Sequence, residues 1–442
     1  MIDQRKPKVI VGLGSTGLAC AHYFAHHGIP FSVVDANPKP PLLKELQRDF
    51  PLVEFQSLDD KVFQPAEEIV LSPGVPLKSV AIQEAISNDA HITGDIEIFS
   101  KAVTKPFVAI TGSNGKTTVT SLLGDMAEKC HKAVQLAGNI GIPSLSVIDA
   151  EVDCFVLEIS SYQLEVIEKL AADVAVVLNL TPDHLDRYAT VQDYYNAKLK
   201  IYTGCSRAVI NRDMDCNLNI QKGVPVVSFG LDEPKNDADI GYKHSDGKTY
   251  LVRGQQILLD VDRFGLRGRH NRQNVAAAVA IGFEIGLNSA GMIDAIQSFK
   301  GLAHRCELVG SYDGVSYIND SKSTNPASSI AAVTGMSDAA GDIVLILGGD
   351  AKGADFSGFD LVCEEQVRLY FIYGKDSQMI SDSIGGDKFI CKTLAEVVNK
   401  LRGSVRSGDK VLLSPGSASL DQFKDYEERG TEFKRLLEKV AQ

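Results

Sequence analysis

The chain has 442 residues, of which 44% are hydrophobic and 23% are charged, and its formal net charge is −12. This length predicts about three domains, and the composition is that of an ordinary globular protein. The acidic balance, with no compensating basic stripe, argues against a nucleic-acid partner. No apolar run approaches the ~20 residues that span a bilayer, so we expect no membrane insertion.

Eight cysteines are scattered along the chain, with no close pair at metal-binding or redox spacing. Several lie in apolar runs, such as Cys154 in Cys-Phe-Val-Leu, and we interpret them as small core residues in a reducing compartment. The N-terminal residues do not have the pattern of a signal peptide. We therefore expect a cytoplasmic protein, and we take it to be a monomer.

The first part of the chain alternates short apolar runs with helical patterns, as α/β units with a parallel sheet do. The predicted strands are residues 8–11, 31–34, 68–71 and 91–94. We expect a Rossmann-like N-terminal domain over residues 1–95, joined to the next domain by a helix that begins near Asp95.

The same alternation continues through the middle of the chain. Predicted strands here are residues 107–111, 154–157 and 174–178. Shorter alternating runs from Asp237 to Leu266 predict a β insertion, and the alanine-rich run over residues 276–281 predicts a helix. We expect a central mononucleotide-binding α/β domain over residues 96–300.

The last part repeats the pattern once more, with predicted strands at residues 341–347, 367–373 and 410–413 and a charged helix at the end. We expect a Rossmann-like C-terminal domain over residues 301–442. The fold class is therefore α/β with three domains.

A glycine-rich turn and a Lys-Thr pair follow the predicted strand 107–111. Such a loop is a phosphate cradle: backbone N–H groups approach the phosphate oxygens, the lysine adds a point charge, and the threonine hydroxyl can ligate Mg²⁺. The loop is shortened, because Ile110 stands where the standard pattern has another glycine, and the alternative is an ordinary strand–turn–helix. The residues of the predicted cradle are Gly112, Ser113, Asn114, Gly115, Lys116, Thr117 and Thr118.

Two further strands of the central region end in chemically active groups, Glu158 and the loop that carries His184. If these strands neighbour the phosphate-loop strand, their ends converge at one edge of the sheet. A carboxylate there suits Mg²⁺, whereas imidazole is not a favoured ligand of a hard cation. Taken alone, Glu158 also fits a solvated carboxylate, His184 a loop histidine and Lys198 a lysine on a helix surface.

Asn271 and Asn274 are one helical turn apart and could face the same ligand. The alternative is that Asn271 caps the helix.

The segment Gly12–Gly17 is a complete G-x-G-x-x-G after a strand, and Asp35 ends the next strand. Alone, this pattern predicts an NAD-dependent oxidoreductase. Such an enzyme does not need a second nucleotide loop, however, and the same turn binds any diphosphate, including that of a UDP-sugar. We therefore favour a nucleotide-diphosphate site made by Gly14, Ser15, Thr16, Asp35, Ser72, Pro73 and Gly74.

With these residues in view, the chain resembles the Mur ligase family, which builds the peptidoglycan stem peptide. The likeness covers essentially the whole chain. The motifs that carry it are Thr111–Thr118, Gly138–Gly141, Glu158–Leu164, Asn179–Arg187, Gly268–Asn271, His304–Arg305, Asn319–Thr324 and Ser414–Phe423.

The resemblance implies roles for the weaker candidates. It implies that Thr117 and Glu158 serve a first Mg²⁺, that His184 and a carbamylated Lys198 hold a second, and that Lys116, Glu158, His184 and Lys198 are catalytic. It implies that Asn139 orients the UDP-sugar acceptor. It implies further that ATP is bound by Asn271, Asn274, Arg305 and Asp320. The residues that it implies receive the amino acid, D-glutamate, are Lys322, Thr324, Lys352, Ser419, Leu420 and Tyr426.

The activity that the resemblance implies is ATP-dependent addition of D-glutamate to UDP-N-acetylmuramoyl-L-alanine through an acyl phosphate. The Asp-Asn-Pro-Arg motif of the members that select meso-diaminopimelate is absent. A ligase that adds glutamate to folates shares the phosphate loop, but Gly12–Gly17 and Ser414–Phe423 argue against it. A regulatory nucleotide-binding module, which binds ATP without turnover, is a third possibility beside the ligase and the dehydrogenase.

Overall fold

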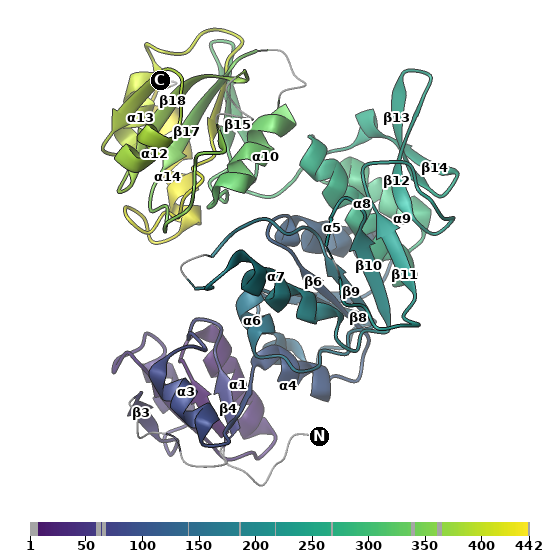
Figure 1. The fold of residues 1–442 in the computed structure, drawn as a ribbon, viewed down its shortest axis with the longest axis vertical. Helices are drawn as coiled ribbons and strands as arrows, with labels where there is room; N and C mark the ends of the chain where they lie inside the picture. Colours follow the sequence, from purple (N-terminus) through teal and green to yellow (C-terminus); the bar gives the residue numbers. More distant parts are fainter. Residues whose placement is uncertain are drawn as a thin grey trace. The chain divides into compact units, whose positions relative to one another are not determined.

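The computed structural model describes residues 8–58, 63, 68–139, 141–184, 187–216, 218–266, 268–336, 341–359 and 365–440. Their strands form three sheets. Figure 1 labels those strands for which there is room. The chain divides into two compact units. One holds the described parts of Met1–Leu180, Gln192–Val261 and Val275–Ala295, and the other those of Thr181–Val191, Asp262–Asn274 and Ile296–Gln442.

The first sheet has five strands in the order β3-β2-β1-β4-β5, and every pairing in it is parallel. The strands are β1 (Lys8–Val11), β2 (Phe31–Asp35), β3 (Phe55–Ser57), β4 (Glu68–Leu71) and β5 (His91–Thr93). Helices α1 (Ser15–His26), α2 (Leu43–Asp49) and α3 (Val80–Ser87) connect them. This is the predicted Rossmann-like arrangement, in which β1 lies at the centre and is buried throughout, as a parallel strand covered on both faces must be.

The second sheet has nine strands in the order β14-β13-β12-β11-β10-β9-β6-β8-β7. Its parallel part consists of β6 (Phe107–Thr111), β7 (Val134–Gly138), β8 (Cys154–Glu158), β9 (Val174–Val177), β10 (Arg207–Asn211) and β11 (Val226–Phe229). The predicted β insertion is confirmed as the antiparallel strands β12 (Ile240–Ser245), β13 (Lys248–Arg253) and β14 (Gln256–Asp260), which extend the sheet beyond β11 (Figure 1).

The connections of this central region are mostly helical. They are α4 (Asp95–Ala102), α5 (Lys116–Lys129), η1 (Ser144–Val147), α6 (Ser161–Glu165), α7 (Val191–Leu199), η2 (Lys200–Tyr202), η3 (Val261–Arg263), α8 (Arg269–Glu284) and α9 (Ser289–Ser298). The predicted joint helix near Asp95 is therefore present as α4, and the predicted helix over residues 276–281 is the interior of α8.

The third sheet has six strands in the order β15-β16-β20-β17-β18-β19. Its strands are β15 (Glu307–Tyr312), β16 (Val315–Asn319), β17 (Ile343–Gly348), β18 (Val367–Tyr373), β19 (Lys388–Cys391) and β20 (Lys410–Leu413). Only β15 is antiparallel to its neighbour. The helices described here are α10 (Pro326–Met336), α12 (Ser377–Ser383), α13 (Leu394–Leu401) and α14 (Tyr426–Val440), the last being the predicted charged helix.

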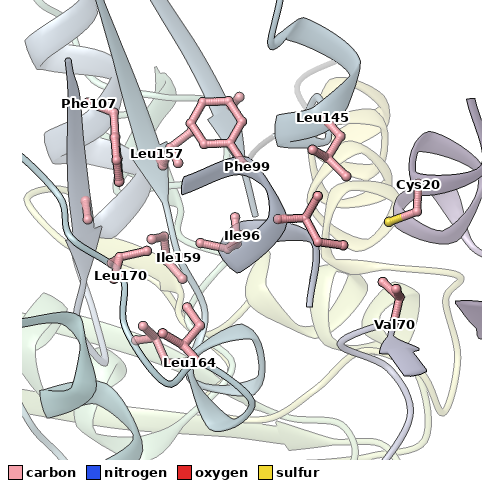
Figure 2. Packing of buried hydrophobic residues seen from close by; sticks show 14 of the residues in the cluster. Cys20, Val70, Ile96, Phe99, Phe107, Leu145, Leu157, Ile159, Leu164 and Leu170 are labelled. Carbon is pink, nitrogen blue, oxygen red and sulfur yellow. The ribbon is translucent and has the colours of Figure 1, made fainter. Parts of the chain in front are cut away.

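One apolar core is shared by the regions around the first and second sheets. Helix α4 contributes the buried Ile96 and Phe99 to a cluster that also includes Cys20 and Val70 of the first-sheet region and Leu157 of the second sheet (Figure 2). Phe99 makes edge-to-face contacts with Phe107 and Phe155, with ring centroids 5.8 and 5.2 Å apart. The joint helix is therefore part of a continuous core rather than an exposed linker.

The cysteines partly follow the prediction. Cys20, Cys154, Cys205 and Cys391 are buried, whereas Cys216 is exposed; Cys363 lies outside the described residues. Within the described ranges, no helix combines the length and apolar character needed to cross a bilayer.

Candidate functional site

A cavity of about 670 Å³ opens where the first sheet meets the central region. The residues predicted to form a nucleotide-diphosphate site all line it: Gly14, Ser15, Thr16, Asp35, Ser72, Pro73 and Gly74. Asn139, which the resemblance implies orients the UDP-sugar acceptor, lines it as well. The volume of the cavity is in the range of small-molecule sites. The sequence prediction of a common site for these residues agrees with their placement around one cavity.

The glycine-rich turn shapes this cavity by close packing. A Cβ atom on Gly17 would lie 2.0 Å from the Gly12 carbonyl oxygen, so only glycine fits there. At Gly14, by contrast, an added Cβ would meet nothing within 4 Å. Helix α1 begins directly after Gly14, and its first residues line the cavity, so its N–H groups and dipole favour an anion there.

Asp35 and Ser72 hold the turn in place. The Asp35 carboxylate accepts hydrogen bonds from the backbone N–H groups of Leu13, at 2.7 Å, and Asn37, at 2.8 Å. The Ser72 hydroxyl donates to the Gly12 carbonyl at 2.8 Å. Both residues therefore shape the cavity as well as line it.

The phosphate loop lies at the carboxyl end of β6, as predicted. Strand β6 pairs with β8 on one side and β9 on the other, so Glu158 and the residues after Val177 end beside the loop. Helix α5 begins at Lys116, and the Lys116 ammonium donates to the carbonyls of Gly112, at 2.8 Å, and Ser113, at 3.1 Å. The predicted convergence of these strand ends is confirmed for the loop and Glu158.

Asn179 forms three hydrogen bonds with the phosphate loop, a role that we did not predict. Its amide oxygen accepts from the N–H of Asn114 at 2.8 Å, its amide nitrogen donates to the Asn114 carbonyl at 3.0 Å, and its own carbonyl accepts from the N–H of Ser113 at 3.0 Å. An asparagine directly after a buried strand, beside a glycine-rich loop, was the available signal.

Glu158 is 2% exposed, and its two oxygens differ. Oε1 accepts from the Asn139 side-chain amide at 2.7 Å, whereas Oε2 has no hydrogen-bond partner among the described residues. The adjoining strand end is held close, because a Cβ on Gly138 would lie 2.3 Å from the Glu158 carbonyl oxygen. The arrangement leaves one buried carboxylate oxygen available for a cation.

Lys198 is buried, so its interpretation as a lysine on a helix surface is wrong. It lies near the end of α7 and is 2% exposed. Its ammonium donates to the Gly112 carbonyl at 2.9 Å and lies 4.8 Å from the centre of the Tyr194 ring. The Tyr194 hydroxyl donates to Ser113 Oγ at 3.0 Å, so two side chains of α7 form hydrogen bonds with the phosphate loop on its buried side. Helical periodicity alone could not say which face of α7 is inside.

His184 belongs to the other unit, and its side chain is 40% exposed. It lies in a loop whose Asp183 carboxylate accepts from the His184 N–H at 2.8 Å and from the Asn325 side chain at 2.9 Å. The following motif residues Leu185 and Asp186 lie outside the described residues, as does Ile140 of the Gly138–Gly141 motif. Whether His184 meets Glu158 and Lys198 stays a prediction.

Asn271 and Asn274 lie on one face of α8, both nearly buried, with their side chains 3.3 Å apart in a hydrogen bond. The helix begins at Arg269, so Asn271 is inside its first turn and is not the cap. This agrees with the shared-ligand interpretation.

Asp320 is buried beside Arg305. Its carboxylate accepts from the hydroxyls of Ser323 and Ser414, the latter at 2.7 Å, and from the N–H of Cys306 at 3.1 Å. Burial raises the pKa of Asp320, against the opposing effects of these hydrogen bonds and of the Arg305 charge. The carboxylate is thus already held by the protein, which makes it a rigid acceptor at the end of β16.

The residues predicted to receive the amino acid follow neighbouring strands of the third sheet. The Lys322 ammonium lies 3.9 Å from the centre of the Tyr426 ring. Asp350 and Ala418 form a two-bond bridge at 2.9 Å each, which brings the loop of Lys352 alongside that of Ser419. Ser419 is buried, whereas Thr324, Lys352 and Leu420 are exposed.

Arg429 was not predicted. Its guanidinium is fully buried and donates to the Ser321 hydroxyl at 2.9 Å, the Ser321 carbonyl at 2.7 Å and the Ser417 carbonyl at 3.0 Å. It therefore ties the loops after β16 and β20 together. A charged residue inside the charged helix α14 gave no signal of this placement.

Family models match most of the chain. A model of a MurD-like Mur ligase N-terminal domain matches residues 6–94, a model of the Mur ligase middle domain matches residues 110–282, and a model of the Mur ligase glutamate ligase domain matches residues 304–416.

Whole-chain relatives agree with these matches. The UDP-N-acetylmuramoylalanine–D-glutamate ligases of Pseudomonas fluorescens and Pseudomonas aeruginosa are each 41% identical over 440 residues, which are 98% of this chain and 98% of theirs. Among solved structures, a pseudomurein peptide ligase type C from Methanothermus fervidus has the same fold, with a TM-score of 0.63 at 15% identity over 99% of this chain and 100% of that one. The chain belongs to the Mur ligase family.

Proposed function

We propose that this protein is an ATP-dependent ligase that adds D-glutamate to UDP-N-acetylmuramoyl-L-alanine in peptidoglycan precursor synthesis. Relatives that are named for this activity and share about two-fifths of its residues over the full length support the proposal. The reaction is taken to occur in the cytoplasm, where ATP is available, and the chain to act as a monomer.

In structural terms, the proposal rests on the position of Asn139. It lines the nucleotide-diphosphate cavity, and its side chain also donates to Glu158 Oε1 beside the phosphate loop. A substrate whose UDP part occupies the cavity would thus extend its far end toward the phosphates of ATP. Asn139 would then lie between the two proposed sites, as the joining of a UDP-linked carboxylate to phosphate chemistry requires.

The residues present fit Mg²⁺. Glu158 Oε2 is a buried oxygen with no hydrogen-bond partner among the described residues, and Thr117 stands in the first turn of α5. Lys198 lies against the same loop, and a carbamate on its amine would replace nitrogen by the oxygen that a hard cation prefers. Thr117 and Glu158 would serve one ion, His184 and Lys198 a second. Bound there, the ions supply neutralising charge to the phosphates.

The chemical difficulty of the reaction is that a carboxylate must approach a triphosphate. A carboxylate oxygen of the substrate attacks the γ-phosphorus, the bond to ADP breaks, and an acyl phosphate forms. Lys116 would turn from the loop carbonyls that it now contacts to the transferred phosphoryl group, where charge develops. Asn179 holds the loop's N–H groups in place for the same phosphates. Asn271, Asn274, Arg305 and Asp320 are proposed to bind the rest of ATP.

The second half of the reaction joins the amino acid. The amine of D-glutamate attacks the acyl carbonyl, a tetrahedral intermediate forms, and phosphate leaves. The positive charges of Lys322 and Lys352 would stabilise the two carboxylates of the amino acid. The other residues proposed to surround it are Thr324, Ser419, Leu420 and Tyr426. Arg429 adds a buried positive charge beneath the same loops.

A phosphate-release assay tests the proposal. Purified protein is given ATP and Mg²⁺ with UDP-N-acetylmuramoyl-L-alanine and a panel of D- and L-amino acids. Phosphate release is expected only when the UDP-sugar and D-glutamate are both present. Phosphate release that requires L-glutamate instead of D-glutamate, or release without the two substrates, would contradict the proposal. Binding of NAD(H) to the first region, read by nicotinamide fluorescence, would instead revive the dehydrogenase interpretation of Gly12–Gly17.

A further inference from the structure

A buried carboxylate lies directly behind the wall of the nucleotide-diphosphate cavity. Asp95, the first residue of α4, is 2% exposed. The side-chain amide of Gln163 donates to its two oxygens, at 3.4 and 3.2 Å, and the Ser144 hydroxyl lies 3.5 Å from the second. Asp95 itself does not line the cavity, so a direct contact with substrate does not explain it.

Both partners of Asp95 belong to segments that form the central-region side of the cavity. Gln163 lines the cavity itself. Ser144 directly follows Pro143, which lines it together with Gly141. One carboxylate thus holds two wall segments that belong to different elements, η1 and α6.

The amide of Gln163 is bound at both ends. Its oxygen accepts from the N–H of Ser160 at 3.0 Å and from the Ser160 hydroxyl at 3.2 Å, while its nitrogen donates to Asp95. These bonds leave the side chain one orientation toward the cavity. Ser160 lies two residues after Glu158, so the same network reaches the strand end that carries the proposed metal ligand.

We infer that Asp95 is a positioning residue for the nucleotide-diphosphate substrate, because it holds Gln163 and the Gly141–Ser144 segment in the shape of the cavity wall. The inference rests on the proposed function, since it takes a UDP-sugar as the occupant. Two constraints that share one buried acceptor form a wall that is rigid before the substrate arrives, which lowers the ordering cost of binding.

The charge of Asp95 is suited to this role. Burial raises its pKa to about 6, and hydrogen bonds from Gln163, the Ile96 N–H and Ser144 oppose the rise. The carboxyl is therefore mostly ionised near neutral pH, where both side-chain donors point at it. Among the described residues, the Cys20 thiol of α1 also faces it, and the pKa of this thiol is raised by burial and by the Asp95 charge.

The same helix supplies a matched control. Glu97, two residues further on, is 1% exposed. Its carboxylate forms an ion pair with Lys101 at 2.8 Å and accepts a hydrogen bond from the N–H of Glu168 at 3.2 Å. It is also a buried acid that ties α4 to the segment after α6, but neither it nor these partners line the cavity. Glu97→Gln therefore reports the general cost of disturbing α4.

The test uses the full chain. UDP binding is measured by titration calorimetry, and KM is measured for UDP-N-acetylmuramoyl-L-alanine and for ATP. Asp95→Ala is expected to weaken UDP-sugar binding by about tenfold or more, because buried donors lose their acceptor. The KM for ATP is expected to stay within about twofold, since the phosphate loop makes no bond to Asp95. Asp95→Asn keeps one acceptor oxygen and is expected to recover most of the affinity.

The outcomes separate the inference from the proposed function. A wild-type protein that binds neither UDP nor the UDP-sugar would overturn the proposed function. The role of Asp95 would be overturned if the Asp95→Ala variant bound UDP and the UDP-sugar as tightly as the wild type. It would also be overturned if Glu97→Gln lost as much affinity as Asp95→Ala. If Asp95→Ala does not fold, Ser144→Ala removes the weaker contact alone. An approximately twofold loss of UDP affinity is then expected, and unchanged affinity would count against the inference.

Discussion

Replacing Asn179 by alanine tests how the phosphate loop is held. The substitution removes two side-chain hydrogen bonds to the backbone of Asn114, at 2.8 and 3.0 Å, and leaves the bond from Ser113 to the Asn179 carbonyl. The strand and its core neighbours are not touched. We expect the loop to lose its fixed shape while the fold persists.

The size of the effect follows from these two bonds. A hydrogen bond of this kind contributes about 0.5–1.5 kcal/mol net, so the pair contributes about 1–3 kcal/mol. Because about 1.4 kcal/mol corresponds to a factor of ten, kcat/KM for ATP is expected to fall by about 5- to 150-fold if the loss falls on the loop. Asn179 is only half-buried, which favours the lower part of this range.

The assay is steady-state phosphate release with ATP varied, and then with the UDP-sugar varied. Asn211→Ala is the control, because Asn211 is buried at the end of the adjoining strand β10 and makes two similar bonds, to the Leu178 carbonyl and from the Asp213 N–H. It should lower stability but not the ATP parameters. Unchanged ATP kinetics in Asn179→Ala, or the same loss in both variants, would refute the reasoning.

Four further changes test other parts of the site. Lys116→Ala should lower kcat by about 10³-fold with the circular-dichroism spectrum intact, because it removes the charge proposed to stabilise the transferred phosphoryl group. Near-normal turnover would show that the loop takes no part in the reaction. Lys198→Ala should be inactive and partly rescued by short carboxylic acids or bicarbonate, and full activity without rescue would contradict the carbamate. Ser419→Ala should raise KM for the amino acid much more than for ATP, and a selective effect on ATP would reverse the assignment of the C-terminal loops. The pKa of Asp95 is raised in the folded state, so its contribution to stability falls as pH rises from about 4 to about 6 and is constant above. Denaturant titrations of Asp95→Asn and wild type should therefore diverge over that interval by up to about 3 kcal/mol, and parallel curves would contradict it.

The sequence was most informative where one physical requirement dominates a segment. Parallel strands buried on both faces read as continuous apolar runs, which is why β1, β6, β8 and β17 were predicted closely. A phosphate loop and a G-x-G-x-x-G turn each need particular residues at fixed spacing, so both were predicted as anion sites. Edge strands such as β7 and β15 are only half-buried and lack a clear pattern, and they were missed.

What the sequence could not supply are contacts between distant segments. Lys198 is inside because α7 turns that face toward the phosphate loop, which helical periodicity leaves open. The grip of Asn179 on Asn114 and the bond of Gln163 to Asp95 join residues 65 and 68 positions apart. These pairings are fixed by strand order, and the strand order was not predicted.

The continuous core through α4 has a consequence for dissecting this protein. Ile96 and Phe99 belong to the same buried cluster as Cys20, Val70 and Leu157, so a cut at residue 95 would expose apolar surface on both resulting fragments. Truncations designed at that position would therefore yield sticky, poorly soluble pieces, even though a sequence boundary falls there. The region around the first sheet is therefore best studied together with the region around the second sheet, because the two are expected to unfold cooperatively.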